Sequence, residues 1–242
     1  MLDLACGAGH LLRRLAQAGE QDLTGVDVVF AKTWLARRFV LPPDAGVTLV
    51  CADLRAPWPV PVRPATYVTC HDTLYFLEDP AALLDTAAAH AAAGGAVVAG
   101  HCHNTGQPGH PLPPEGWAAL LPGATCYAEE ELTSATLEGR LPRPAPVEEL
   151  GDTEAVAIAR DEASVPADPT LLDPAPGADL ATNPLYADGT RSWPNDRWGA
   201  EYGLRAATYL PEQLPGPAPA PGDAAYADWV RRRLLVDLPE RW

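Results

Sequence analysis

Short apolar runs and longer periodic segments alternate along the first hundred residues. The runs predict buried strands, one opening the chain and the others at 22–27, 46–52, 65–70 and 96–100. Between them, apolar residues recur every three or four positions and predict helices over 9–18, 31–40 and 80–90. This alternation predicts an α/β protein with a Rossmann-like, doubly wound, mostly parallel sheet and helices on both faces.

The pattern changes after Asn104. Twenty of the 27 prolines follow it, the helical patterns at 114–121 and 129–138 are short, and only 154–160 reads as a further strand. We therefore predict a core at 1–160 and a Pro-rich C-terminal cap or extension at 161–242. Within this extension, aromatic residues gather at 183–209. We expect them either to cover the sheet edge or to form a wall of the substrate pocket. The apolar pattern of residues 223–242 predicts a C-terminal helix.

The chain of 242 residues carries a formal charge of −15, from 32 acidic and 17 basic residues. This charge argues against binding nucleic acid through phosphates. The five cysteines are scattered, with no CxxC pair, which favours a reduced, cytoplasmic protein. No apolar run reaches the length of a membrane span, so no membrane contact is predicted.

The first ten residues lead from an apolar strand through a turn with Gly7 and Gly9 into a helix. Glycine can take backbone angles that are closed to other residues and lets a ligand lie against the main chain. Asp27 and Asp53 end the next two apolar runs. Carboxylates at successive strand ends line the edge of a parallel sheet where such sheets bind ligands.

Two other nucleotide-binding motifs fit less well. A dinucleotide fingerprint aligned on Gly7 and Gly9 needs glycine or alanine at position 12, which is Leu. A P-loop is excluded, because the sequence has no GxxxxGK[ST] motif and the only lysine, Lys32, lies elsewhere.

The motif Leu2-Asp-Leu-Ala-Cys-Gly-Ala-Gly9 resembles the first motif of class I S-adenosylmethionine (SAM) dependent methyltransferases, with Ala5 where that motif often has its first glycine. The resemblance covers residues 1–104 and continues through 25–27, 51–54, 70–72 and 94–98. It implies SAM as cofactor and methyl transfer as activity.

The resemblance also implies roles for single residues. Asp27 is expected on the ribose hydroxyls, Asp53 on the adenine amino group and the Leu54 amide on a ring nitrogen, while Asp3 fixes the loop or reaches the methionine ammonium. A turn or helix cap is the alternative role for each aspartate. The full set of predicted cofactor-binding residues is Asp3, Ala5, Gly7, Gly9, Asp27, Val28, Asp53, Leu54 and His71.

Methyl transfer is an in-line displacement that needs a base when the acceptor is a weakly acidic hydroxyl. His101 and His103 follow the fifth predicted strand, and strand alternation places both side chains on one side. We predict that one of them is the base. A structural role is the alternative for each histidine. The pair beside Asp72 could instead hold a metal; because magnesium prefers oxygen ligands, we predict no metal site.

The predicted function is SAM-dependent methylation of a small-molecule acceptor at a hydroxyl group. The alternatives are a non-catalytic SAM-binding partner or regulatory subunit, and an enzyme using NAD or a nucleotide sugar. Met1 stands where the first strand is already under way, so the helices that precede this strand in the resembling family are missing. We expect an upstream start, a trimmed fragment, or a homodimer or partner chain that covers this face.

Overall fold

The computed structural model describes residues 1–56, 63–161 and 179–237. Its contacts divide the chain into two compact units: unit 1, Met1–Leu132 with Pro142–Ala167, and unit 2, Thr133–Leu141 with Asp168–Glu240. The predicted domain boundary at 160/161 stays a prediction. Residues 162–178 of the predicted extension, and the last five residues of its helix, lie outside the described residues.

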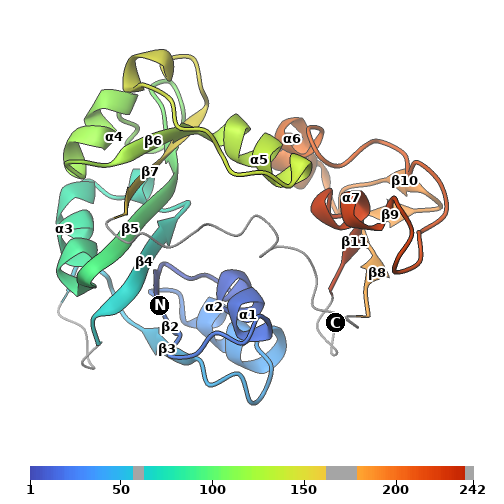
Figure 1. The fold of residues 1–242 in the computed structure, drawn as a ribbon, viewed down its shortest axis with the longest axis horizontal. Helices are drawn as coiled ribbons and strands as arrows, with labels where there is room; N and C mark the ends of the chain where they lie inside the picture. The colour runs from blue at the N-terminus through green and yellow to red at the C-terminus, as the bar shows by residue number, and fades with distance from the viewer. Residues whose placement is uncertain (57–62, 162–178, 238–242) are drawn as a thin grey trace. The chain divides into compact units, whose positions relative to one another are not determined.

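Unit 1 is built on a seven-stranded sheet with the order β3-β2-β1-β4-β5-β7-β6 (Figure 1). Strands β1 to β5 are parallel, and β7 runs antiparallel to its neighbours β5 and β6. This arrangement confirms the predicted Rossmann-like, mostly parallel sheet. The sequence pattern missed β6. The strands are β1 (Leu2–Leu4), β2 (Thr24–Asp27), β3 (Thr48–Cys51), β4 (Ala65–His71), β5 (Ala91–His103), β6 (Thr125–Ala128) and β7 (Ala155–Asp161).

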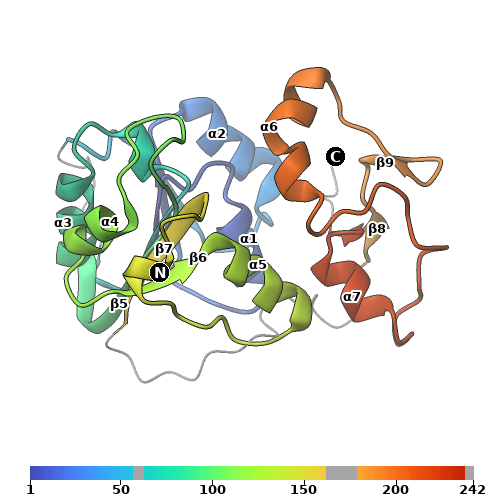
Figure 2. The same cartoon turned by 90° about the horizontal axis from the view of Figure 1, so that it is seen from above.

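Two separate apolar clusters join helices of unit 1 to the sheet. Figure 2 shows α3 and α4 apart from α1 and α2. One cluster joins the sheet to α3 and α4 and includes Leu84 and Trp117; the other lies beneath α1 and η1 and includes Leu12 and Ala36. The helices are α1 (His10–Gln17), α2 (Phe30–Leu35), the π-helix η1 (Ala36–Val40), the 3-10 turns η2 (Leu74–Phe76) and η3 (Val147–Glu149), α3 (Pro80–His90), α4 (Pro114–Leu120) and the start of α5 (Glu129–Glu138), whose residues from Thr133 on belong to unit 2.

Helix α3 begins and ends where the pattern predicts. Asp79 caps it by accepting a hydrogen bond from the Ala82 amide at 3.2 Å, and Pro80 stands in the first turn, where its missing N–H costs nothing. The helix stops at His90 because β5 begins at the next residue.

The apolar pattern of the predicted helix at 31–40 places Trp34, Leu35 and Phe39 together on its apolar face, and this prediction is wrong. Trp34 and Leu35 are 49% and 42% exposed, whereas Thr33, Ala36 and Val40 are buried. The physical reason is the glycine loop: a Cβ on Gly9 would lie 3.3 Å from the Cβ of Ala36, so only a small side chain fits there. The large residues therefore turn outward.

Unit 2 contains short elements around a small apolar cluster in which Tyr186, Leu210 and Trp229 are buried. The predicted helix over 223–242 is found at Tyr226–Arg231 and is wrong over 232–237, because Arg233 takes a left-handed φ of 60° and the chain then pairs as β11 with β8. The elements are β8 (Ala181–Thr182), β9 (Tyr186–Ala187), β10 (Thr190–Arg191), α6 (Asp196–Ala206), α7 (Tyr226–Arg231) and β11 (Leu235–Val236).

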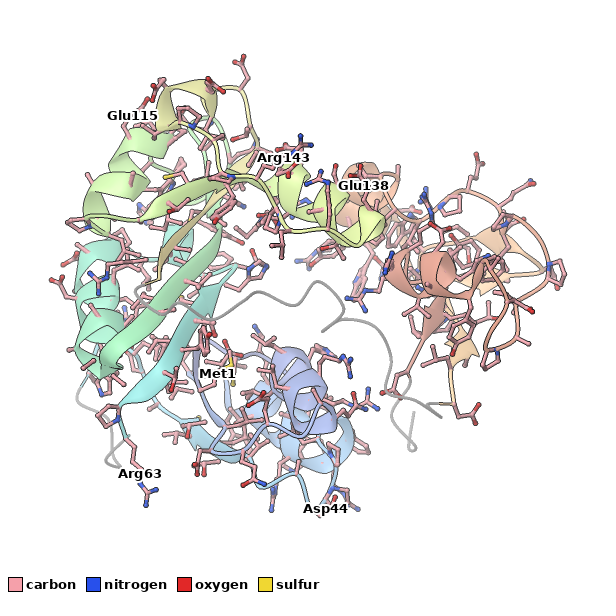
Figure 3. All side chains as sticks on the ribbon, viewed as in Figure 1. Met1, Asp44, Arg63, Glu115, Glu138 and Arg143 are labelled. Carbon is pink, nitrogen blue, oxygen red and sulfur yellow. The ribbon has the colours of Figure 1, made fainter. Side chains whose placement is uncertain are left out.

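The charged side chains of Asp44, Arg63 and Glu115 project outward from unit 1 (Figure 3). Among the described residues, every helix is too short or too polar to cross a lipid bilayer.

Candidate functional site

The loop after β1 turns sharply through left-handed residues. Ala5, Gly7 and Gly9 have φ angles of 57°, 56° and 76°. The loop is closed by hydrogen bonds from the Cys6 amide to the Val26 carbonyl and from the Gly9 amide to the Cys6 carbonyl, at 3.0 and 2.9 Å. A Cβ on Gly7 would meet no atom within 4 Å, so the main chain faces open space there. The left-handed angle of Ala5 explains why glycine is common at this position.

Asp27 fastens this loop to the end of β2. Its Oδ2 accepts a hydrogen bond from the Gly7 amide and its Oδ1 from the Val29 amide, both at 2.8 Å. Asp27 is only 4% exposed. The predicted alternative of a turn-forming aspartate is therefore realised, and each oxygen keeps a second lone pair for a ligand.

Asp3 lies buried in β1, between β2 and β4, and its Oδ1 accepts a hydrogen bond from the Thr69 hydroxyl at 2.8 Å. Burial, with a smaller contribution from the charge of Asp27, raises the pKa of the Asp3 carboxyl from 3.8 to about 6, although the hydrogen bond from Thr69 lowers it. A carboxyl group with such a pKa in a ligand-binding edge is typical of a functional site.

The carboxylate of Asp53 forms an ion pair with the nearby Arg55. Arg55 donates to it from Nε at 2.9 Å and from Nη2 at 2.7 Å, and these bonds hold the Asp53 pKa down at about 2. Leu54 is half-buried beside it, whereas Val28 is 59% exposed after β2. The strand order brings these residues to the same edge as the glycine loop.

Leu12 replaces the small residue of a dinucleotide fingerprint without disturbing the packing. It is fully buried, and a Cβ on Gly25 of β2 would lie 2.5 Å from its Cδ1. The glycine that lets this helix approach the sheet is therefore on the strand and not on the helix.

The ends of β4 and β5 form a second part of the edge. Asp72 and His101 both take left-handed φ angles, of 55° and 54°. The pairing of β5 with β7 shifts register between Ala99 and Cys102, so a bulge re-aims the residues between them. The prediction of simple alternation omits this bulge, but His101 and His103 still converge, with their Nε2 atoms 3.3 Å apart.

Each imidazole has a second partner. The Nδ1 of His103 lies 2.9 Å from the Pro108 carbonyl oxygen. A carbonyl only accepts hydrogen bonds, so this nitrogen carries the proton and the Nε2 of a neutral His103 has a lone pair. His101 faces Glu129 through Nδ1 at 3.6 Å and Asp72 through Nε2 at 3.7 Å.

Aromatic and amide side chains hold the pair in place. The Tyr75 ring stacks on His103 with centroids 3.5 Å apart, and its hydroxyl donates to Asp72 Oδ1 at 2.6 Å. The Trp117 indole N–H donates to the His103 carbonyl at 2.8 Å. The buried Asn104 amide donates to the carbonyls of the 150–153 loop. His101 and His103 are buried, while 56% of the Asp72 side chain is exposed.

His71 lies at the end of β4, with its ring 6.1 Å from that of His101. A Cβ on Gly100 would lie 2.3 Å from the His71 Nδ1, so the ring needs the glycine beside it. Sequence analysis missed Glu129 and Tyr75. Glu129 reads as one of three acids that favour a helix N-terminus, and Tyr75 as part of an apolar turn. Only the fold brings them to the histidines.

The strand order, the glycine loop and the polar strand ends define a class I methyltransferase fold. Residues 1–95 match the sequence profile of a family described as "Methyltransferase domain", which confirms the predicted resemblance. A search of curated proteins returned no match to the chain.

Several solved structures are similar to part of the chain. SAM-bound CalS10, an amino pentose methyltransferase from Micromonospora echinaspora involved in calicheamicin biosynthesis, is 31% identical over 40% of each chain, with a TM-score of 0.35. Magnesium protoporphyrin IX methyltransferase (ChlM) from Synechocystis PCC 6803 is 24% identical over 43% of this chain and 47% of its own, with a TM-score of 0.37. The plantazolicin methyltransferase BpumL is 20% identical over 40% of this chain and 37% of its own, with a TM-score of 0.36. The similar region covers less than half of each of these three proteins.

Proposed function

We propose that this chain binds SAM and transfers its methyl group to a hydroxyl of a small-molecule acceptor. The observation that carries the proposal is the glycine loop fastened by Asp27 at the carboxyl ends of β1 and β2, within the part of the chain that matches the methyltransferase family. It lies where β1 separates β2 from β4, the topological switch point at which open α/β sheets bind ligands.

The cofactor would contact residues of this edge in turn. Asp27 would accept hydrogen bonds from the ribose hydroxyls, the exposed Val28 would cover the adenine, and Asp3 would face the methionine ammonium. Asp53 would accept from the adenine amino group only with the oxygen lone pairs that Arg55 leaves. SAM supplies a methyl group made electrophilic by its sulfonium.

His101 and His103 would serve the acceptor. We assign the base to Nε2 of His103, because its Nδ1 proton points to the Pro108 carbonyl. The hydroxyl proton moves to this nitrogen while the acceptor oxygen bonds to the methyl carbon and the carbon–sulfur bond breaks. The products are the methyl ether, a protonated imidazole that returns its proton to water, and S-adenosylhomocysteine.

Calorimetric titration of the full chain with SAM, S-adenosylhomocysteine and NAD tests the cofactor. We expect one site for each of the first two and none for NAD. Incubation with SAM and a panel of sugars, polyketides and phenols, with an amine panel as control, then tests the acceptor. Binding of SAM without product from any hydroxylated compound would favour the non-catalytic alternative.

A homodimer or a partner chain is the second part of the proposal. Val29, Phe30 and Trp34 are 42%, 68% and 49% exposed, although apolar side chains of this size are usually covered. Sedimentation velocity tests it: the wild-type chain should self-associate, or capture its partner, and Phe30→Ser should weaken that association. A wild-type monomer without a partner contradicts this part alone.

A further inference from the structure

Three potential metal ligands converge at the ends of β4 and β5. One ligand atom each from Asp72, His101 and His103 lies within 4.8 Å of the other two. The two imidazoles meet through the same atom, Nε2, at 3.3 Å. Two imidazole nitrogens on one tetrahedral zinc ion, each at about 2.0–2.1 Å, are about 3.3–3.4 Å apart. The observed separation therefore equals one edge of such a coordination shell.

The surrounding groups orient the lone pairs inward. The Pro108 carbonyl accepts a hydrogen bond from Nδ1 of His103, and the Glu129 carboxylate faces Nδ1 of His101 at 3.6 Å. Metal-binding histidines usually place a carbonyl or carboxylate on the nitrogen that does not bind the ion. The Tyr75 hydroxyl in turn orients Asp72.

The ligand types indicate which ion fits. Two imidazoles and one carboxylate suit zinc, cobalt or ferrous iron, whereas magnesium prefers oxygen ligands only. The exposure of Asp72 leaves the cluster open on one side, as in zinc sites that keep a coordination position for water or substrate.

We propose that Asp72, His101 and His103 bind one divalent transition-metal ion, with zinc as the best fit. The predicted absence of a metal would then be wrong. That prediction considered only magnesium, which prefers oxygen ligands, and not the ions that imidazole binds. The proposal does not depend on methyl transfer. If His103 is the base of the proposed function, a bound ion occupies the lone pair that takes the proton, and zinc should inhibit turnover.

The test uses the full chain without an affinity tag, freed of metal by a chelator. Titration with Co²⁺ should give visible absorption bands that saturate at one equivalent and disappear when Zn²⁺ is added. His101→Gln and His103→Gln should each weaken Co²⁺ binding by at least about 100-fold, since even loss of an outer partner costs about 10–100-fold. His110→Gln, at an exposed histidine, is the matched control.

Asp72→Asn keeps the test valid if the buried histidine variants fail to fold, because its side chain is largely exposed. It should weaken Co²⁺ binding and leave the circular dichroism spectrum unchanged. Absence of the bands in the wild-type chain, or equal affinity in folded Asp72→Asn, would overturn the proposal and leave an imidazole–imidazole hydrogen bond as the reason for the 3.3 Å contact. Calorimetry with SAM on the same samples keeps the two proposals apart: SAM binding without Co²⁺ binding contradicts only the metal site.

Discussion

At the β1–β2 part of the sheet edge, a carboxylate contacts backbone amides; at the β4–β5 part, side chains contact side chains. Asp27 accepts from two amides within the loops that it joins, whereas His101 and His103 depend on Asp72, Glu129 and Tyr75. The first arrangement needs only a short loop and one carboxylate. The second requires a bulge and residues brought together from three separate segments. Under the proposed function, the first part binds the cofactor and the second acts on the methyl acceptor.

The largest expected effect sharpens this division. His103→Gln should lower the rate of methyl transfer by roughly 10²–10⁴-fold and leave SAM affinity nearly unchanged, as expected for loss of a general base. Single-turnover kinetics at saturating SAM measure it. His110→Gln is the control. Wild-type turnover in both His101→Gln and His103→Gln across neutral pH would make the pair structural.

Asp27→Ala should mainly weaken SAM binding, whereas the histidine variants mainly lower the rate of methyl transfer. Loss of charge-assisted hydrogen bonds should weaken SAM binding by roughly 1.5–3 kcal/mol, about 10–150-fold. The melting temperature should also fall, because the Gly7 and Val29 amides lose their acceptor. Calorimetry measures the affinity.

Asp53→Ala is the control for Asp27, because Arg55 already occupies much of its carboxylate, and it should cost less affinity. Unchanged SAM affinity in Asp27→Ala would remove the basis for placing the cofactor at this part of the edge.

The smallest expected effect concerns the pH dependence of stability. The pKa of Asp3 is about 6 in the folded chain, above its ordinary value of 3.8. Below about pH 4 both states hold the proton, and the group costs nothing. Between about pH 4 and 6 the unfolded chain releases it first, so the free energy of unfolding falls with rising pH. Above about pH 6 the full cost, roughly 2–3 kcal/mol, remains.

Asp3→Asn removes this ionisation while its side-chain oxygen can still accept from Thr69. The variant should therefore unfold at higher denaturant concentration at pH 7.5, flatten the stability change between pH 4 and 6, and bind SAM more weakly. Equal stability of variant and wild type at pH 7.5 would show that the folded chain carries no such cost.

The sequence predicts the first half of the fold well, because strands and helices there differ clearly in apolar period. Helix α3 appears at its predicted residues for this reason. The face of α2 could not be predicted, since the contact of Ala36 with Gly9 is made between residues distant along the chain. β6 was missed because Thr125–Ala128 lacks the Leu and Val residues that mark the runs around the equally short β2 and β3.

The two parts of the candidate site also differ in how far the sequence predicts them. Gly7, Gly9 and Asp27 follow a motif that is local in sequence, so each could be assigned before the fold was known. The spacing of His101 and His103 predicted that their side chains lie on one side, but the bulge between Ala99 and Cys102 that re-aims them was not predicted. Their contacts with Glu129 and Tyr75 could not be predicted, because these residues lie in other segments of the chain and approach the histidines only in the folded structure.

A crystal structure of the full chain with S-adenosylhomocysteine tests the central claim most directly. The ribose hydroxyls should lie on Asp27 and the homocysteine over the Gly7 loop, and the sulfur should point toward the His101 and His103 pair, with room for an acceptor between them. A ligand bound elsewhere, or a sulfur directed away from the ends of β4 and β5, would contradict it.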